Sequence, residues 1–285
     1  MKPLHRLMGV EPGHNIDLSL APDGAGALLR PWLDECQLVC LRDQDLSAED
    51  LVRITAALGP PIPPLLERFT LPHQRAVYVI SNIVENGMPL GSAADGLVWH
   101  TDLAYLRRPA AYTLLWAKEV PSSGAQTLFA STQAGFDALD TTQRDALIDR
   151  YAYYDYAALR RILHPDLPVS NEQQARAPRT AHPLIRRHPT TGRSSLYVNR
   201  DDCIGMDGME TDDARALIDR LVEISLAQGV YSHKWRAGDL VIWDNRGLLH
   251  TATPFDKVRE RRLMYRTMAE GEVPVPAGST TLEAG

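Results

Sequence analysis

Two histidines and one aspartate form the first candidate for chemistry in this chain. His100 and Asp102 lie two residues apart, and His250 follows a strand-like apolar run that begins after Asp239. Residues i and i+2 of a strand project from the same face, so we expect His100 and Asp102 to reach one metal ion from a strand. Two imidazoles and one carboxylate, with no thiolate, form the facial triad that binds iron(II) in non-haem oxygenases. The pattern therefore predicts an iron(II) site with three open coordination positions.

The charge of such a site points to further residues. Iron(II) with one carboxylate carries a single positive charge, and a chelating keto-acid dianion would turn this into a single negative charge. The distal carboxylate of the keto acid would then need a cation. Arg262 and Arg266 are four residues apart and share one face of an expected strand, whereas Arg261 faces the other way. A guanidinium fork suits a buried carboxylate, and we expect Arg259 and Arg261 to be solvated.

Five segments together resemble the taurine dioxygenase family of iron(II)/2-oxoglutarate-dependent oxygenases. They are WHTD at 99–102, GAQTL at 124–128, HPTTGR at 188–193 with LYVN at 196–199, WDNR at 243–246 followed by His250, and RRLMYR at 261–266. The segments occur in the family's order, and the resemblance covers roughly residues 8–270.

The resemblance implies the fold, the cofactors and the reaction. The fold would be α+β but mainly β: a double-stranded β-helix (jelly roll) with N-terminal and inserted helices. Iron would be bound by His100, Asp102 and His250. The enzyme would consume 2-oxoglutarate and dioxygen, release succinate and carbon dioxide, and in most cases hydroxylate an unactivated C–H bond. Desaturation or ring closure would use the same residues and stays open.

The resemblance also assigns the organic ligands. Thr127 and Arg262 would bind the distal carboxylate of 2-oxoglutarate, in agreement with the charge argument. Arg266 would bind an anionic group of the substrate, and Leu103 and Tyr197 are further candidates for substrate contact. We expect Trp243 and Asn245 to pack around the second histidine strand.

Three positions depart from the taurine enzyme itself. Pro64 or Leu65 stands where that enzyme has a sulfonate-binding histidine, and Gly96 replaces an asparagine before the Trp-His pair. Glu67, if it faces the pocket, would suit a cationic amine. We therefore expect a small anionic or zwitterionic substrate other than taurine.

Two alternatives to an oxygenase remain open. Zinc could occupy the same three ligands in a hydrolase, although zinc usually has four ligands and often softer ones. The chain could also be a non-catalytic binder of small molecules. A hydrolase has no need of Arg262 or Thr127, so dependence on 2-oxoglutarate separates the first alternative from an oxygenase. A lack of succinate formation would favour the second.

The remaining pattern predicts the elements that position these residues. Helical spacing covers 20–36, 47–58, 133–151 and 211–228, and residues 84–98 are expected to form a mobile loop that excludes water. Short strands are expected at 37–41, 77–80, 112–117, 127–130, 184–187, 195–199, 240–243 and 262–267, with a hairpin around 189–193. Many short strands without a βαβ rhythm indicate a barrel or jelly roll, here as one catalytic domain over residues 1–285.

The composition limits which partners and which cellular compartment we expect. The formal net charge is −6 and no dense basic stripe is present, which argues against a nucleic-acid partner. No apolar run approaches the roughly 20 residues of a membrane span, and the first residues do not resemble a secretory signal. The three cysteines suit a reducing compartment, and we assign them no function. We expect a cytoplasmic enzyme with a small-molecule substrate, and a homo-oligomer is left open.

Overall fold

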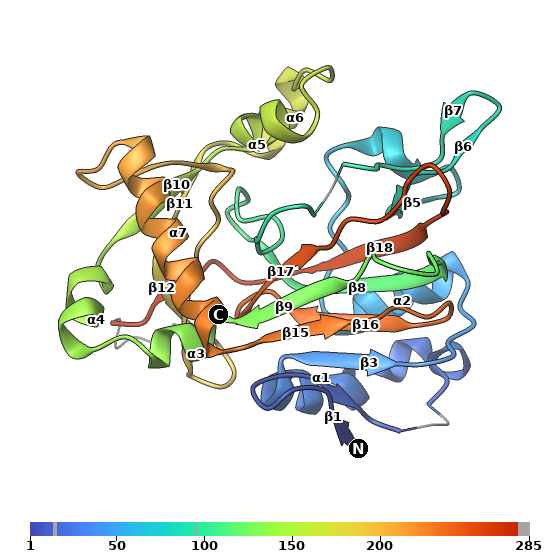
Figure 1. The fold of residues 1–285 in the computed structure, drawn as a ribbon, viewed down its shortest axis with the longest axis horizontal. Coiled ribbons are helices and arrows are strands. Elements are labelled where there is room, and N and C mark those ends of the chain that lie inside the picture. Colours follow the sequence, from blue (N-terminus) through green and yellow to red (C-terminus); the bar gives the residue numbers. More distant parts are fainter. Residues whose placement is uncertain (14–15, 95, 279–285) are drawn as a thin grey trace.

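A mixed sheet of eight strands crosses the centre of the molecule, with the order β1-β2-β3-β16-β8-β18-β5-β4 (Figure 1). The computed structural model describes residues 1–13, 16–94 and 96–278. All neighbours in this sheet are antiparallel except β2 and β3. The strands are β1 (Lys2–Pro3), β2 (Val10–Glu11), β3 (Leu38–Leu41), β4 (Thr70–Leu71), β5 (Gln74–Ser81), β8 (Ala110–Glu119), β16 (Leu240–Asp244) and β18 (Leu263–Glu270).

A second sheet of three strands carries the downstream histidine. Its order is β15 (Val230–His233), β9 (Thr127–Ser131) and β17 (Leu248–Ala252). The chain alternates between the two sheets, because β15 and β17 belong to the smaller sheet and β16 and β18 to the larger one. Buried apolar side chains from both sheets, including Phe129, Trp243 and Met264, pack together as one core. The described strands do not close into a barrel.

Two N-terminal helices cover the other face of the large sheet. They are α1 (Ala25–Cys36) and α2 (Ala48–Leu58). Ser47 and Asp50 form the capping box that begins α2, at the start of the helix expected at 47–58. The hydroxyls of Thr55 in α2 and Thr267 in β18 hydrogen-bond at 2.6 Å, which fixes α2 on the sheet. The first helix begins later than expected, because two 3-10 turns, η1 (Leu18–Leu20) and η2 (Pro22–Gly24), precede it.

Residues between β9 and β15 form a separate lobe of helices and small sheets. The segment expected as one helix at 133–151 contains two helices, because Asp140 begins a new capping box. The expected helix at 211–228 is confirmed. The lobe's helices are α3 (Thr132–Asp137), α4 (Thr141–Leu147), α5 (Tyr156–Leu163), α6 (Asn171–Arg176) and α7 (Thr211–Gln228). Its strands are β10 (Tyr151–Tyr154), β11 (Thr180–Pro183), β12 (Ile185–Arg187), β13 (Ser194–Leu196) and β14 (Cys203–Met206). Figure 1 shows α5 and α6 at the top of the molecule, on the opposite side from α1.

The four remaining elements are short. The hairpin of β6 (Val84–Glu85) and β7 (Met88–Pro89) lies within the segment expected as a loop, and η3 (Glu67–Phe69) precedes β4. β19 (Val275–Pro276) pairs with β12, which also pairs with β13 in the expected hairpin. None of the helices among the described residues has the length and apolar character needed to cross a membrane.

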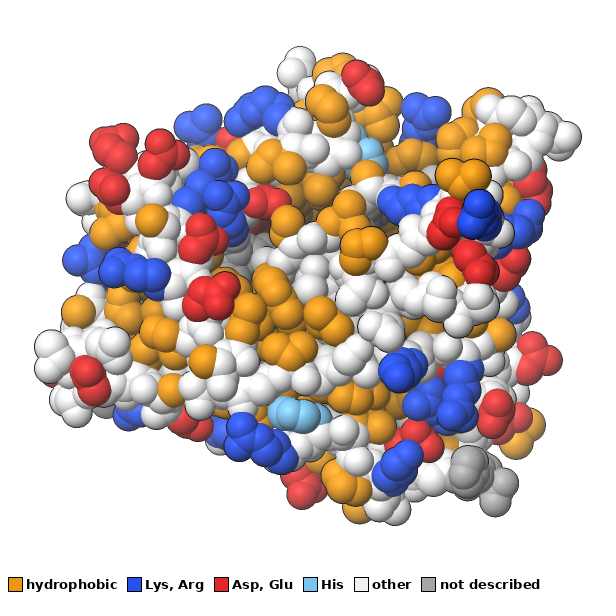
Figure 2. Space-filling view, viewed as in Figure 1, with side chains coloured by type: hydrophobic (Ala, Val, Ile, Leu, Met, Phe, Trp, Pro, Cys, Tyr) orange, Lys and Arg blue, Asp and Glu red, His pale blue; other side chains and the backbone are white. Residues whose placement is uncertain are grey.

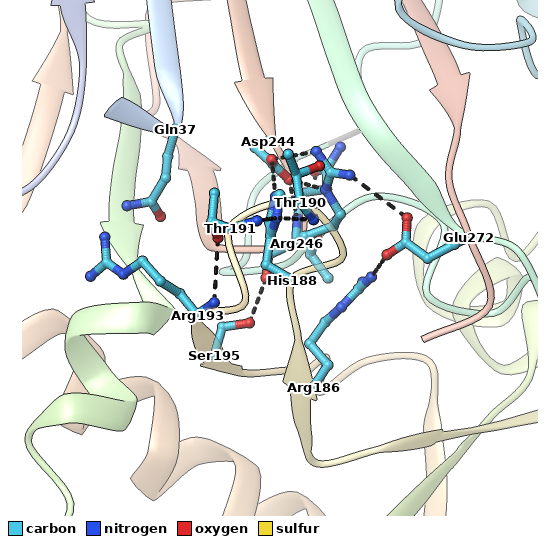
Figure 3. A network of polar contacts seen from close by, with 12 residues as sticks. Gln37, Arg186, His188, Thr190, Thr191, Arg193, Ser195, Asp244, Arg246 and Glu272 are labelled. Carbon is cyan, nitrogen blue, oxygen red and sulfur yellow. Dashed lines mark hydrogen bonds and ion pairs between the residues drawn. The ribbon is translucent and has the colours of Figure 1, made fainter. Parts of the chain in front are cut away.

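A buried network of charged groups fixes the turn between β16 and β17 (Figure 3). Asp244 accepts hydrogen bonds from the Arg246 guanidinium at 2.6 and 2.8 Å, and its Oδ2 lies 2.9 Å from Nε2 of His188. Burial alone would raise the pKa of Asp244, but Arg246 and His188 lower this pKa well below its usual range, so the carboxyl is ionised. Glu272 bridges Arg246 to Arg186, another buried arginine. The turn that leads to His250 is therefore held by ion pairs.

Candidate active site

The three predicted ligands meet at one point. Ligand atoms of His100, Asp102 and His250 all lie within 4.8 Å of one another. An isolated antiparallel bridge joins the backbones of His100 and His250. The distance from the His100 nitrogen to the His250 oxygen is 3.0 Å, and that from the His250 nitrogen to the His100 oxygen is 2.8 Å. The expectation that His100 and Asp102 share a strand was wrong. His100 lies in this single bridge, and Asp102 lies in the turn that follows, because the segment bends away from β17 after one pair.

Asp102 is held as an ionised carboxylate. Its Oδ2 accepts a hydrogen bond of 2.7 Å from the Thr113 hydroxyl in β8. Burial alone would raise the pKa of Asp102, but His250, Arg266, His100 and the Thr113 hydrogen bond together lower it. Nη1 of Arg266 lies 3.7 Å from Oδ1 of the same carboxylate. The site therefore combines a fixed negative charge with an arginine beside it.

The two imidazoles are oriented toward Asp102. Nδ1 of His100 lies 2.8 Å from the Val98 carbonyl, which leaves its Nε2 facing Asp102 at 3.9 Å. Nε2 of His250 lies 3.6 Å from Oδ2 of Asp102, and its ring packs against Trp243 with centroids 4.7 Å apart. Burial lowers the pKa of His250 to about 3, so this imidazole is neutral, as a metal ligand must be.

Two asparagines clamp the backbone between the ligands. Asn199 accepts from the Thr101 N–H at 2.7 Å and donates to the Thr101 carbonyl at 2.9 Å. Asn245 accepts from the Asp102 N–H at 3.2 Å and donates to the Thr113 hydroxyl at 2.8 Å. Asn245 also accepts from the Trp243 indole, so both residues of the expected packing pair support the ligands. Of these two residues, Asn245 hydrogen-bonds to the ligand segment and Trp243 packs against the His250 ring.

A large cavity opens on one side of the triad. Its wall includes His100, Asp102, Leu103, Arg266 and Asn199. Apolar and aromatic residues make up much of the remaining wall: Pro64, Leu65, Leu66, Val98, Trp99, Tyr105, Leu159, Leu163 and Met268. Leu103 has a left-handed backbone with φ of 60°, which turns the chain immediately after Asp102. The cavity thus joins the metal ligands to an arginine and an apolar surface.

A smaller cavity contains Arg262. It is lined by residues that include Ser81, Leu97, Ala252 and Lys257. Arg262 is 8% exposed, and its Nε has no hydrogen-bond partner among the described residues. Burial lowers the pKa of Arg262 to about 10, which still leaves the guanidinium charged at neutral pH. A buried cation without a described counter-ion is suited to binding an anion.

Thr127 lies in the same region through strand pairing. In β9 it pairs with Ala252, a residue of the smaller cavity's wall. The Thr127 hydroxyl accepts a hydrogen bond of 3.0 Å from the Trp235 indole. Its own proton stays available for a carboxylate, since a hydroxyl can accept and donate at once. Thr127 itself is not among the described residues that line this cavity.

Two candidates for substrate contact lie elsewhere. Glu67 begins η3, is exposed, and pairs with Arg176 at 3.2 Å. Tyr197 is buried in the core of the helical lobe, where the Arg186 guanidinium lies 5.0 Å from its ring centroid. Neither is among the described residues that line the large cavity, whereas Leu103 and Arg266 are. The condition under which Glu67 would suit an amine, that it faces the pocket, is therefore not met.

Sequence reasoning missed Thr113, Arg160, Asp201 and Asp202. Thr113 contacts Asp102, and the other three line the large cavity. Arg160 donates to the Tyr156 hydroxyl at 2.9 Å from α5, a helix that the sequence did not predict. Asp201 and Asp202 directly follow the LYVN segment and Arg200, so their place beside a recognised motif was the available signal.

A second buried group of metal-ligand types proves to be structural. Cys40, His233 and Asp239 also lie within reach of one another. Oδ2 of Asp239 already accepts from Arg42 at 2.5 Å and lies 3.2 Å from Nε2 of His233. Burial raises the pKa of the Cys40 thiol to about 12, so it is protonated. An arginine on the carboxylate and a neutral thiol disfavour a cation there.

Comparison with known proteins identifies the family. The model of the "Taurine catabolism dioxygenase TauD, TfdA family" matches residues 1–268. The chain belongs to this family. The α-ketoglutarate-dependent 2,4-dichlorophenoxyacetate dioxygenase of Cupriavidus pinatubonensis is 30% identical over 95% of this chain and 98% of that protein. Pentalenolactone F synthase of Streptomyces arenae is 32% identical over 75% of this chain and 74% of that one.

A solved structure agrees with this placement. AAD-2, crystallised with Mn(II) and N-oxalylglycine, superposes with a TM-score of 0.81 at 25% identity, covering 96% of this chain and 99% of that one. As a member of the TauD/TfdA family, the chain is a 2-oxoglutarate-dependent dioxygenase that uses iron(II) and dioxygen. The donor set of two imidazoles and one ionised carboxylate fits that metal.

Proposed function

We propose that this enzyme oxidises, and in most turnovers hydroxylates, an unactivated C–H bond of a small molecule with an anionic group. His100, Asp102 and His250 would hold iron(II), Arg262 and Thr127 the distal carboxylate of 2-oxoglutarate, and Arg266 the anionic group of the substrate. When bound, the metal, 2-oxoglutarate and dioxygen supply the oxidising power and yield succinate and carbon dioxide.

The separation of the two arginines carries this proposal. Arg262 lines the smaller cavity and Arg266 the larger one, although only three residues separate them. Arg266 also lies 3.7 Å from a ligand carboxylate, so an anion bound there lies beside the triad. Two different anions can thus be bound at the same time, one for each arginine. This is what a keto acid and a second substrate require.

The chain's own residues would orient the substrate and exclude water. Arg266 fixes one end of the substrate by a charge-assisted hydrogen bond. Leu65, Leu103 and Leu159 surround the rest of it with apolar surface. Gly96, Val98 and Trp99 line the same cavity at the end of the segment expected to act as a loop over the site. Removal of water from such a cavity strengthens the electrostatic contacts within it.

We also propose a jelly-roll fold, a single domain, a cytoplasmic location and a small-molecule partner. Alternation of β15, β16, β17 and β18 between two sheets supports a double-stranded β-helix with added helices. We treat residues 1–285 as one catalytic domain in the cytoplasm and leave open whether it forms a homo-oligomer. Basic and acidic side chains are interspersed over the face shown in Figure 2, so the described part of this face offers nucleic acid no continuous basic surface.

A screen for succinate release tests the proposed reaction. Aryloxy acids, sulfonates, amines and amino acids compete for one enzyme supplied with iron(II), 2-oxoglutarate and oxygen. The proposal requires succinate in proportion to oxidised product for at least one class with an anionic group. Turnover of a substrate without 2-oxoglutarate would point to a hydrolase at the triad, and no succinate with any class would indicate a binding protein. Analysis of the product separates hydroxylation from desaturation or ring closure.

A further inference from the structure

The large cavity presents carboxylates as well as arginines. Asp201 and Asp202 line it, and they follow directly after Asn199 and Arg200. Asn199 contacts both sides of the site, because its side chain binds the backbone of Thr101 between the metal ligands and its Nδ2 lies 3.4 Å from Oδ2 of Asp202. Asn199 therefore links Asp202 to the backbone between His100 and Asp102.

One carboxylate oxygen of Asp202, Oδ1, receives no hydrogen bond from the described residues. The residue is 1% exposed, and its Oδ1 is buried with no hydrogen-bond partner among the described residues. Arg215 is near enough to favour the ionised form. However, its Nε and Nη2 donate to the backbone carbonyls of Cys203 and Asp201 rather than to this carboxylate. A buried carboxylate oxygen without a donor is costly, so this position is suited to a donor brought by a ligand.

The other carboxylates near the cavity are already paired. Asp201 lies 3.3 Å from Nη1 of Arg200. Asp102 is a metal-ligand candidate with Thr113 and Arg266 beside it. Glu67, which the sequence suggested for binding an amine, pairs with Arg176 outside the cavity's described wall. Among these four acidic residues, Asp202 alone combines a place in the wall with an unsatisfied oxygen.

We propose that Asp202 binds a cationic group, most simply an ammonium, on the same substrate whose anionic group binds Arg266. This inference rests on the proposed function and narrows its substrate class to zwitterions with an apolar carbon skeleton. Burial raises the pKa of the Asp202 carboxyl to about 7, and an ammonium beside it would favour the ionised form. Leu103 and Tyr105 in the wall supply apolar surface for the carbon skeleton.

Matched pairs of small molecules test the inference by binding alone. The enzyme is loaded with iron(II) and 2-oxoglutarate without oxygen, and each compound is titrated against the visible band of the chelated keto acid. One pair is 6-aminohexanoate and heptanoate, and another is L-leucine and 2,4-dimethylpentanoate, in which a methyl group replaces the ammonium. In at least one pair we expect the amine to bind about tenfold more tightly than its methyl partner, as for one charge-assisted hydrogen bond.

Two variants test whether the Asp202 carboxylate causes the tighter binding of the amine. Asp202→Asn should abolish the preference for the amine while the binding of heptanoate changes by less than about threefold. The matched control Asp201→Asn removes a carboxylate that Arg200 already pairs, and it should keep the preference. If Asp202→Asn fails to form the band, Asp202→Ser replaces it. A preference that survives loss of the Asp202 carboxylate, or that disappears equally in Asp201→Asn, would overturn the assignment.

The wild-type measurement is decisive without any variant. If no amine binds more tightly than its methyl partner, the inference is wrong. If the band itself does not form on adding 2-oxoglutarate, the proposed function fails instead, so the two failures are distinguishable.

Discussion

The Thr113 hydroxyl donates a hydrogen bond of 2.7 Å to Oδ2 of Asp102, and the same hydroxyl accepts from Asn245 at 2.8 Å. Three buried polar groups from β8, the turn after β16 and the ligand segment therefore form one chain. The Thr113 hydroxyl contacts Oδ2 of Asp102 and not Oδ1. The orientation of the aspartate thus depends on a residue that binds neither metal nor substrate.

Removing this hydroxyl should weaken metal binding. Thr113→Val keeps the shape but removes the hydroxyl that donates to Asp102 and accepts from Asn245. Loss of such a supporting contact lowers metal affinity by about 10–100-fold, and we expect iron(II) binding to fall within that range. Thr113→Ser retains the hydroxyl and should restore most of the affinity in an anaerobic iron titration. Equal affinity in the valine variant and the wild type would show that Asp102 is positioned by other contacts.

Arg262→Ala should greatly raise the 2-oxoglutarate requirement. Truncation of one partner of a buried charge pair costs about 2–5 kcal/mol, mainly because the other charge is left unpaired. Arg261→Ala is the matched control, because Arg261 is exposed and pairs with Glu119 at 2.8 Å. The dissociation constant for 2-oxoglutarate, measured from the visible band, should change in Arg262→Ala and stay near wild type in Arg261→Ala. The reverse pattern would transfer the role to Arg261.

Arg266→Ala should separate substrate binding from 2-oxoglutarate binding. Arg266 lines the large cavity and Arg262 the small one, so loss of Arg266 removes the contact with the second substrate. We expect the KM of the substrate found in the screen to rise, while the affinity for 2-oxoglutarate and the slow succinate formation without substrate persist. A loss of 2-oxoglutarate affinity as large as in Arg262→Ala would end the case for two anion sites.

Asp244→Asn should destabilise the fold. The substitution removes the Asp244 carboxylate from the buried Arg246 and His188 side chains, and breaking a buried ion pair costs about 3–5 kcal/mol. The folded-state pKa of Asp244 is lowered, so its contribution is present above the unfolded pKa of about 3.9 and is lost as the pH falls below it. Urea unfolding should therefore show a difference at neutral pH that shrinks on acidification.

Asp23→Asn is the control for this experiment, because the Asp23–Arg53 pair is on the surface. It should change stability little at any pH. If the Asp244→Asn variant is as stable as the wild type at neutral pH, the network in Figure 3 does not hold the turn.

The sequence predicted those parts of the site that depend on local spacing. The ligand triad, the paired arginines and the helices at 47–58 and 211–228 have periodic or motif signals, and the structure brings these ligands together. Thr113 could not be found this way, because its role arises from β8 crossing beside a distant turn. The strand expected for His100 and Asp102 was wrong for a similar reason, since one bridge to β17 supports the segment.

The substrate side was harder to predict because it depends on which way side chains face in irregular segments. Glu67 would suit an amine only if it faced the pocket, but the 3-10 turn η3 places it in an exposed pair with Arg176. Asp202 carries no periodic signal, and only its burial beside Asn199 shows that it belongs to the cavity. Arg160 was missed with α5, a short helix in the inserted lobe.

One anaerobic titration tests whether His100, Asp102 and His250 hold iron(II) for a keto acid. Wild-type enzyme, His100→Ala and Asp102→Ala are each given iron(II) and 2-oxoglutarate, and bound iron and the visible charge-transfer band are recorded together. We expect wild type to bind iron and show the band, and both variants to lose most of the iron and all of the band with their fold retained. Full iron occupancy with the band intact in either variant would show that the substituted residue does not hold the metal.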